Sequence, residues 1–347
     1  MFESHPGEEE LMRKNPVFLL LIVALLSGCG AKRMAKGPSD VVYIVASDAV
    51  LEKVQTAIDT TFSFGIRTPE FQHYYMTSWH PLDQLKEFLY YPHTIVVVDM
   101  NVNDTSRRLI KGLLSEERLE SIKQDTVALF ALPNTWQDVQ TLIIAAGYDM
   151  DKLSDFIMER QAWIYSKIDQ KYIERQSRFL FGRYEQKDLS RKLGNKYGWT
   201  MRMPSDYQII REYPNQNFVW LGRALPYRWI SVSCAKGIKT EWLTANGLFQ
   251  KREAIGSLYG QIKTEKRFLG HKFVELGGWN ALRMWGLWYH EEEARGGPFV
   301  TYSFYDKYSD KTYVIDMLVY SPGEKTVNYT RQMEIIARTF RTVDKEN

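Results

Sequence analysis

Apolar runs that alternate with helical patterns between residues 41 and 147 limit the possible fold more than any other feature of the sequence. Residues 41–46 and 93–100 are almost wholly apolar, which is typical of strands buried on both faces of a sheet. Further strands are predicted at residues 71–77 and 126–132, and helices at residues 48–58, 82–89, 104–123 and 135–146. Helices must cover both faces of such a sheet. The pattern therefore predicts an α/β domain over residues 41–147.

A helical connector is predicted to follow, over residues 148–197. This segment has no proline, many charged side chains, and apolar positions at helical spacing. A break is expected at residues 179–182, because a glycine such as Gly182 costs about 1 kcal/mol inside a helix.

The periodicity changes after Gly198. Short apolar runs are separated by Pro204, Pro214 and Pro226, which is typical of antiparallel strands. Strands are predicted at residues 199–203, 207–213, 218–223, 229–233, 281–290, 299–306 and 312–320, and helices at residues 240–262 and 327–340. We therefore expect residues 198–347 to form an α+β domain, with an antiparallel sheet backed by helices.

Residues 16–26 form an apolar run that is too short to cross a membrane, because a spanning helix needs about 20 apolar residues. Arg13 and Lys14 precede this run, and small residues follow it up to Gly28. This arrangement is typical of a signal peptide, which we predict over residues 1–28. The acidic residues before Arg13 do not fit such a signal, so Met12 is predicted to be the true start.

The tetrapeptide Leu-Ser-Gly-Cys at residues 26–29 resembles the lipobox of bacterial lipoproteins. The resemblance implies cleavage between Gly28 and Cys29 and acylation of Cys29, with palmitate among the expected fatty acids. The alternative is an ordinary secretory signal or an uncleaved anchor. Residues 29–40 are mostly small or basic and contain glycine and proline, so we expect them to form a tether. An anchor with three acyl chains would hold the protein on its membrane permanently.

The residues after Cys29 indicate the compartment. Gly30 follows directly, where an aspartate would retain an enterobacterial lipoprotein at the inner membrane, so the outer membrane is predicted. Lys32, Arg33 and Lys36 stand where surface-exported lipoproteins of Bacteroidota carry an acidic cluster. This difference favours a body that faces the periplasm.

Charge and cysteine content limit the possible partners. Without residues 1–28 the chain has 43 lysines and arginines against 38 acidic residues, and this charge of about +5 is too mild to indicate nucleic acid. Cys234 is the only other cysteine, so an acylated Cys29 leaves no intramolecular disulfide. The histidines lack metal-ligand spacing and no G-x-S-x-G motif occurs, so no metal, cofactor or catalytic residue is predicted.

Tryptophan is concentrated in the second half, where seven of the ten tryptophans lie between Trp199 and Trp288. Trp220, Trp285 and Trp288, together with Gly296 and Gly297, are the candidates for a platform that stacks on sugar rings. The competing interpretation, which we prefer, places the tryptophans in the core of the sheet. It assigns the two glycines to a strand connection with unusual dihedral angles.

Four short segments of the C-terminal half carry a family resemblance, namely residues 286–288, 296–302, 319–325 and 331–334. They resemble an uncharacterised domain-of-unknown-function family of envelope lipoproteins, found chiefly in Bacteroidota and their relatives. The resemblance implies lipid attachment and a two-part body, and it carries no known activity. A weaker resemblance, in residues 197–207, 217–221 and 335–341, is to the PsbP-type α/β sandwich.

Two classes of function remain open at this point. The first is a lipid-anchored, non-enzymatic module that binds or scaffolds another envelope protein or a cell-wall or lipid component. The alternative is a hydrolase or transferase that acts on envelope glycans or lipids, with acids such as Glu291 or Asp306 brought together by the fold. A cleft with two accessible, facing carboxylates would favour the enzyme.

Overall fold

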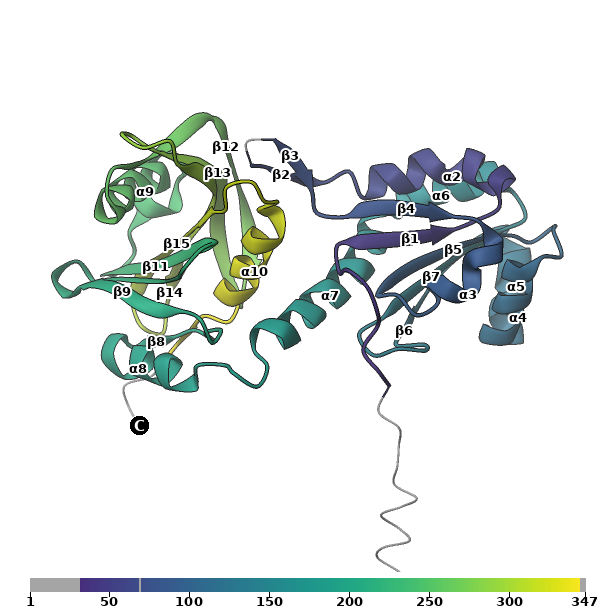
Figure 1. Ribbon diagram of the computed structural model, residues 1–347, viewed down its shortest axis with the longest axis horizontal. Helices are drawn as coiled ribbons and strands as arrows, with labels where there is room; N and C mark the ends of the chain where they lie inside the picture. Colours follow the sequence, from purple (N-terminus) through teal and green to yellow (C-terminus); the bar gives the residue numbers. More distant parts are fainter. Residues whose placement is uncertain (1–31, 69, 344–347) are drawn as a thin grey trace, which may run out of the picture.

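The computed structural model describes residues 32–68 and 70–343, which form an α/β half and an α+β half joined by helices (Figure 1). The predicted fold class is thereby confirmed. The signal peptide at residues 1–28, Met12, Gly28 and Cys29 all lie outside the described residues. Within the described part of the chain, no helix combines the length and the apolar character needed to span a membrane.

A five-stranded sheet forms the N-terminal half, with the strand order β4-β1-β5-β7-β6, in which β6 alone runs antiparallel to its neighbour. The elements of this half are β1 (Val41–Val45), α2 (Asp48–Thr61), β2 (Gly65–Arg67), β3 (Phe71–His73), β4 (Met76–His80), η1 (Leu82–Gln84), α3 (Leu85–Phe88), β5 (His93–Asp99), α4 (Thr105–Leu113), α5 (Glu116–Asp125), β6 (Val127–Pro133) and β7 (Thr141–Gly147). β2 and β3 pair separately as a short hairpin.

Helices cover both faces of this sheet, because successive side chains of a strand point to opposite sides. Ile44 and Val97 pack into the core that contains α2, α6 (Met150–Glu159) and α7 (Gln161–Leu180). Val45 and Val98 pack into the core formed with α3, α4 and α5. The two layers explain why the central strands are apolar throughout.

One predicted helix is wrong. Residues 135–146 end in β7, whose residues are all buried between β5 and β6. A short, uniformly apolar run has the same composition in a buried strand and in a buried helix, so periodicity does not separate them. The single helix predicted at residues 104–123 is also divided, because Ser115 accepts a hydrogen bond from the backbone of Arg118 and begins α5.

The connector consists of α6, α7 and α8 (Lys187–Tyr197). α6 packs against α2 and so belongs to the first half, whereas α7 extends from the first sheet to α10 (Val327–Ala337) of the second half. α7 ends at Leu180, inside the break predicted at residues 179–182.

The C-terminal half is a seven-stranded antiparallel sheet with the order β12-β13-β14-β15-β11-β10-β9. Its further elements are β8 (Trp199–Thr200), β9 (Gln208–Tyr213), η2 (Pro214–Gln216), β10 (Phe218–Arg223), β11 (Tyr227–Lys236), η3 (Thr240–Leu243), α9 (Ala245–Tyr259), β12 (Ile262–Leu276), β13 (Trp279–His290), β14 (Gly296–Asp306), β15 (Lys311–Tyr320) and β16 (Arg341–Thr342). α9 and α10 lie on opposite faces of this sheet (Figure 1). β12 is missing from the sequence prediction, because this edge strand carries many polar, partly exposed residues.

Residues 32–40, which were predicted to belong to a tether, lie against the first half. The backbone of Arg33 and that of Ala35 each form a hydrogen bond with Asp138, at 2.8 and 3.1 Å. Arg175 of α7 donates to the carbonyl groups of Ala35 at 2.7 Å and Gly37 at 3.1 Å. These contacts bury Ala35 and hold residues 32–40, the described part of the predicted tether, against the first half.

Candidate functional site: a charged cleft between the halves

A cleft of about 190 Å³ lies where the two halves meet. One wall comes from α7 and the segment before β4, and the other from α10 and the strands β12, β13 and β14. Four tyrosines line it, namely Tyr74, Tyr165, Tyr172 and Tyr302. Its charged side chains are Asp169, Lys272, Glu275, Arg283, Arg331, Glu334 and Arg338. The cleft is thus both aromatic and strongly charged.

Arg331 of α10 connects the two walls. Its guanidinium group is paired with Asp169 of α7 and donates to the Tyr75 hydroxyl at 2.9 Å and the Tyr74 carbonyl at 3.1 Å. The guanidinium carbon lies 3.4 Å from the ring centroid of Tyr172. A buried cation is costly unless it is paired and hydrogen-bonded, and the first half supplies these contacts.

A second charged pair also lines the cleft. Arg283 of β13 contacts Glu334 of α10, with 2.7 Å between Nε and Oε1. The hydroxyl of Tyr302 on β14 donates to the same carboxylate oxygen at 2.6 Å. Arg331 and Glu334 lie three residues apart on α10, a spacing that places both on one face of the helix.

These pairs keep the cleft groups ionised. Burial acts to raise the pKa of Glu334, but the charge of Arg283 and the hydrogen bonds from Arg283 and Tyr302 lower this pKa overall. Burial acts to lower the pKa of Arg331, but the neighbouring Tyr75, Tyr172 and Asp169 raise it overall. At neutral pH the cleft therefore holds a carboxylate and a guanidinium ion.

The first turn of α10 is also bound by the first half. The side-chain oxygen of Gln72 on β3 accepts hydrogen bonds from the backbone of Thr326 and of Val327, both at 3.0 Å. Asn328 donates to the carboxylate of Asp40 at 2.8 Å. Gln72 thus satisfies amide groups that the start of a helix leaves without a partner.

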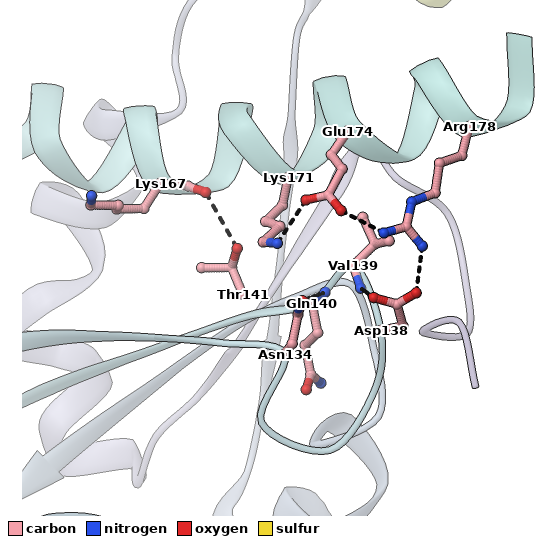
Figure 2. A network of polar contacts seen from close by, with 9 residues as sticks. All are labelled: Asn134, Asp138, Val139, Gln140, Thr141, Lys167, Lys171, Glu174 and Arg178. Atoms are coloured by element: carbon pink, nitrogen blue, oxygen red, sulfur yellow. Dashed lines mark hydrogen bonds and ion pairs between the residues drawn. The ribbon is translucent and has the colours of Figure 1, made fainter. Parts of the chain in front are cut away.

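On the other side of α7, a network of polar contacts holds the turn between β6 and β7 (Figure 2). Arg178 lies between Asp138 of the turn and Glu174 of the same helix, and Glu174 also contacts Lys171 at 2.7 Å. The Thr141 hydroxyl donates to the carbonyl group of Lys167 at 3.3 Å. α7 is therefore fixed to the first sheet along much of its length.

The structure does not bring the predicted tryptophan platform onto one surface. Trp220 and Trp288 are buried on the face of the sheet that α9 covers. Trp285 packs on the opposite face, where its ring lies 4.8 Å from the guanidinium carbon of Arg283. Trp285 is therefore the member of the predicted set that lies beside the cleft.

Gly296 and Gly297 begin β14, and neither has the positive φ expected of an unusual connection. A β-carbon at Gly297 would lie 2.1 Å from the carbonyl oxygen of Val319. That carbonyl accepts a hydrogen bond from Trp288 Nε1 at 3.1 Å. Glycine at position 297 therefore allows close packing of two strands and an indole ring.

The other predicted groups lie away from the cleft. Glu291 is exposed beyond the end of β13, and Asp306 is buried, where it accepts hydrogen bonds from Trp279 at 3.1 Å and the Ser309 hydroxyl at 2.7 Å. Cys234 is buried, and burial raises the pKa of its thiol. Over residues 32–68 and 70–343, histidine, cysteine and acidic side chains form no group of three that could hold a metal ion.

The charged pairs of the cleft were not identified from the sequence. Arg331 and Glu334 belong to a segment that carries the family resemblance. Their spacing of three residues, which places both on one face of a helix, could have indicated that they act together. Asp169 stands among many charged residues of a long helix, so nothing in the sequence distinguishes it.

Comparison with known families supports the family resemblance in a coarser form. Residues 186–339 match a family model described as a domain of unknown function, DUF4837. The match extends from the residue before α8 to the end of α10, so it includes Arg283, Arg331 and Glu334 but not Asp169. The C-terminal part of this protein therefore resembles an uncharacterised family, and no curated protein matches the chain.

Several solved structures are distantly similar to part of the chain. A protein of Bacteroides thetaiotaomicron is 10% identical over 43% of this chain and 47% of its own length, with a TM-score of 0.27. The Ran-binding protein Mog1p of Saccharomyces cerevisiae is 15% identical over 42% of this chain and 91% of its own, with a TM-score of 0.30. LpqN of Mycobacterium tuberculosis is described as involved in cell envelope biogenesis. It is 11% identical over 42% of this chain and 83% of its own length, with a TM-score of 0.28.

Proposed function

We propose that this protein is a lipoprotein of the cell envelope that binds or scaffolds another envelope protein or a cell-wall component. Acylation of Cys29 would anchor it in the outer membrane, with its body in the periplasm. The lipobox-like residues 26–29 and the apolar run before them support the anchor. Mass spectrometry of the mature protein should find an acylated, amino-terminal Cys29, and a mature protein that begins elsewhere contradicts the anchor.

The charge pairing in the cleft is the observation that favours binding over catalysis. Asp169 and Glu334 each contact an arginine, and the pKa of Glu334 is lowered. A general acid needs a carboxyl group that stays protonated near the working pH, which requires a raised pKa. The two carboxylates therefore suit structural and recognition roles better than proton transfer.

The rim of the cleft indicates what kind of ligand it would bind. Lys272 and Arg338 are exposed at this rim, and Tyr165 is half-buried beside them. Ammonium and guanidinium groups next to tyrosine rings suit an acidic side chain, or a sugar ring that carries a carboxylate. A cleft of about 190 Å³ admits one such group, which fits recognition of part of a larger partner.

Crosslinking in intact envelopes tests this proposal. A photo-crosslinking residue at Lys272 should capture one recurrent envelope component, and Arg338→Glu in the same chain should reduce the captured amount about tenfold. Lys86→Glu on α3, an exposed position in the other half, is the matched control and should leave capture unchanged. Equal capture by the two variants would contradict a role for the cleft.

An envelope-acting hydrolase or transferase is the second candidate, because the cleft does contain three carboxylates, those of Asp169, Glu275 and Glu334. If Glu334 took part in catalysis, Glu334→Gln would abolish turnover of cell-wall glycan or phospholipid while the fold persisted. We expect no turnover from the unmodified protein on either substrate. Turnover that is lost in Glu334→Gln would replace the binding proposal with the enzyme.

A further inference from the structure

The start of the described chain is held very close to the proposed anchor. Only Gly30 and Ala31 separate Cys29 from Lys32. Lys32 Nζ contacts the carbonyl groups of Asn134 and Thr135, the latter at 3.0 Å. Three residues of fully extended chain span at most about 11 Å. An acylated Cys29 would therefore hold the surface around Lys32 within about 11 Å of the lipid headgroups.

Two of the most exposed aromatic side chains lie on the same side of the molecule. Phe179, near the end of α7, is 74% exposed, and Tyr184, in the loop that follows, is 72% exposed. Arg178, which precedes Phe179, is paired with Asp138, and the backbone of Asp138 donates to Arg33 at 2.8 Å. Figure 1 places the loop after α7 and the start of the described chain along the same lower edge.

The loop that carries Tyr184 is firmly attached to the second half. Arg202 contacts the carboxylate of Glu185 through two nitrogen atoms, each at 2.7 Å. The backbone of Gln186 donates to Met203 at 2.9 Å, and its side chain donates to Pro204 at 2.9 Å. Tyr184 is therefore held in an outward position, so its exposure is a property of the fold.

The surroundings of these aromatic side chains are basic. Residues 178–196 contain six lysines and arginines and two acidic residues. The guanidinium carbon of Arg183 lies 5.7 Å from the ring centroid of Tyr184. Aromatic rings with a polar edge are enriched where a membrane meets water, and basic side chains beside them attract anionic headgroups.

We infer that this edge of the body docks on the membrane surface, with Phe179 and Tyr184 at the level of anionic phospholipid headgroups. The inference rests on the proposed acylation of Cys29 and goes beyond it, because an anchor alone would keep only the surface around Lys32 near the membrane and would not fix the tilt of the body. Docking through Phe179, Arg183 and Tyr184 leaves the hairpin of β2 and β3 pointing away from the membrane (Figure 1). The lipid anchor and this surface together supply the two signals that stable membrane attachment uses.

Depth-dependent quenching tests the docked orientation. Full-length, acylated protein is reconstituted into vesicles of phosphatidylcholine and phosphatidylglycerol that contain a lipid with a nitroxide on its headgroup. A fluorophore is attached through Tyr184→Cys or, as the matched control, through Phe64→Cys. Phe64 is 56% exposed and directly precedes β2, which lies at the opposite edge in Figure 1. Cys234 is buried, so labelling is directed to the introduced cysteine.

The probe at position 184 is expected to be quenched about threefold more strongly than the probe at position 64. Adding Arg183→Glu should reduce this ratio about twofold, because the variant repels anionic headgroups. Equal quenching of the two probes, with acylated Cys29 found by mass spectrometry, overturns the docking and leaves the anchor intact. Absence of the acyl group overturns the anchor itself and, with it, the docking.

Discussion

Each face of the seven-stranded sheet buries charged pairs among aromatic rings, but the pairs on the two faces connect different parts of the protein. The cleft face carries the pairs Arg283–Glu334 and Arg331–Asp169, which connect α10 to the strands below it and to α7 of the other half. The face under α9 also holds a charged pair, Arg252 of α9 with Asp316 of β15 at 3.4 Å, beside aromatic rings such as that of Trp220, which lies 4.8 Å from that of Trp229.

The two faces of this sheet therefore have two structural roles, one between the halves and one within the second half. Under α9, the Arg252–Asp316 pair and the aromatic rings connect elements of the second half to one another, so they stabilise that half. Charged pairs tolerate only a narrow range of geometries, because an unpaired buried charge is costly. We therefore interpret the cleft face as the one that fixes how the two halves meet, and the α9 face as the one that stabilises the second half.

Replacing Arg331 should break the cleft face most severely. Arg331→Met leaves Asp169 without its partner and removes the contact with the Tyr172 ring, so the free energy of unfolding should fall by about 3–5 kcal/mol. Urea denaturation measures this loss. Arg338→Met, at the exposed position that directly follows α10, should change the stability by less than about 0.5 kcal/mol.

Crowding the α9 face should have the next largest effect. Gly297→Ala places a β-carbon 2.1 Å from the Val319 carbonyl oxygen, and the resulting strand displacement should cost about 2–3 kcal/mol in thermal or urea unfolding. Gly112→Ala, where a β-carbon meets no atom, is the control. A neutral Gly297→Ala would mean that this glycine is not required for packing.

Acidification should weaken the region around the cleft through His93, a buried residue whose ring lies 6.1 Å from that of Tyr75. Burial, together with the charges of Arg331 and Arg175, lowers the pKa of His93 to about 3. The unfolded chain binds a proton below about pH 6.5 and the folded protein does not, so stability is lost as the pH falls through this range.

Between pH 6.5 and 5 the loss from this group should be about 2 kcal/mol. His93→Gln should remove that part of the pH dependence, whereas His73→Gln, at an exposed position, should retain it. Unfolding curves at several pH values measure the difference. The same slope in His93→Gln as in the unmodified protein would refute a neutral, buried imidazole.

A smaller change is expected from the indole of Trp288. Trp288→Phe removes the hydrogen bond to the Val319 carbonyl group and leaves that acceptor without this donor, at a cost of about 1 kcal/mol. Thermal unfolding detects a change of this size. Trp242→Phe, at a partly exposed position in η3, is the control and should cost less.

The sequence predicts those elements whose periodicity is unambiguous. The strand at residues 218–223 was predicted with its observed bounds, and the fold class, an α/β half followed by an α+β half, was also predicted correctly. β7 was mistaken for a helix because its apolar run has no period, and β12 was missed because its polar residues give no strand pattern. Local pattern therefore fails where tertiary burial or an edge position determines the structure.

The cleft could not be predicted because it is made of pairs that are distant in sequence. Arg331 and Asp169 are 162 residues apart. Each looks like a solvated charge within its own helix, and only the packing of α10 on α7 brings them together. The predicted candidates at Trp220 and Trp288 instead lie in the core under α9. Tryptophan density predicts packing as readily as binding.

A double-mutant cycle tests most directly whether Arg331 holds the two halves together through Asp169. Urea unfolding is measured for the unmodified protein, Arg331→Met, Asp169→Asn and the double variant. We predict a coupling free energy of about 2–3 kcal/mol, because removing Asp169 relieves much of the damage caused by losing Arg331. Effects that add within about 0.5 kcal/mol would contradict the account.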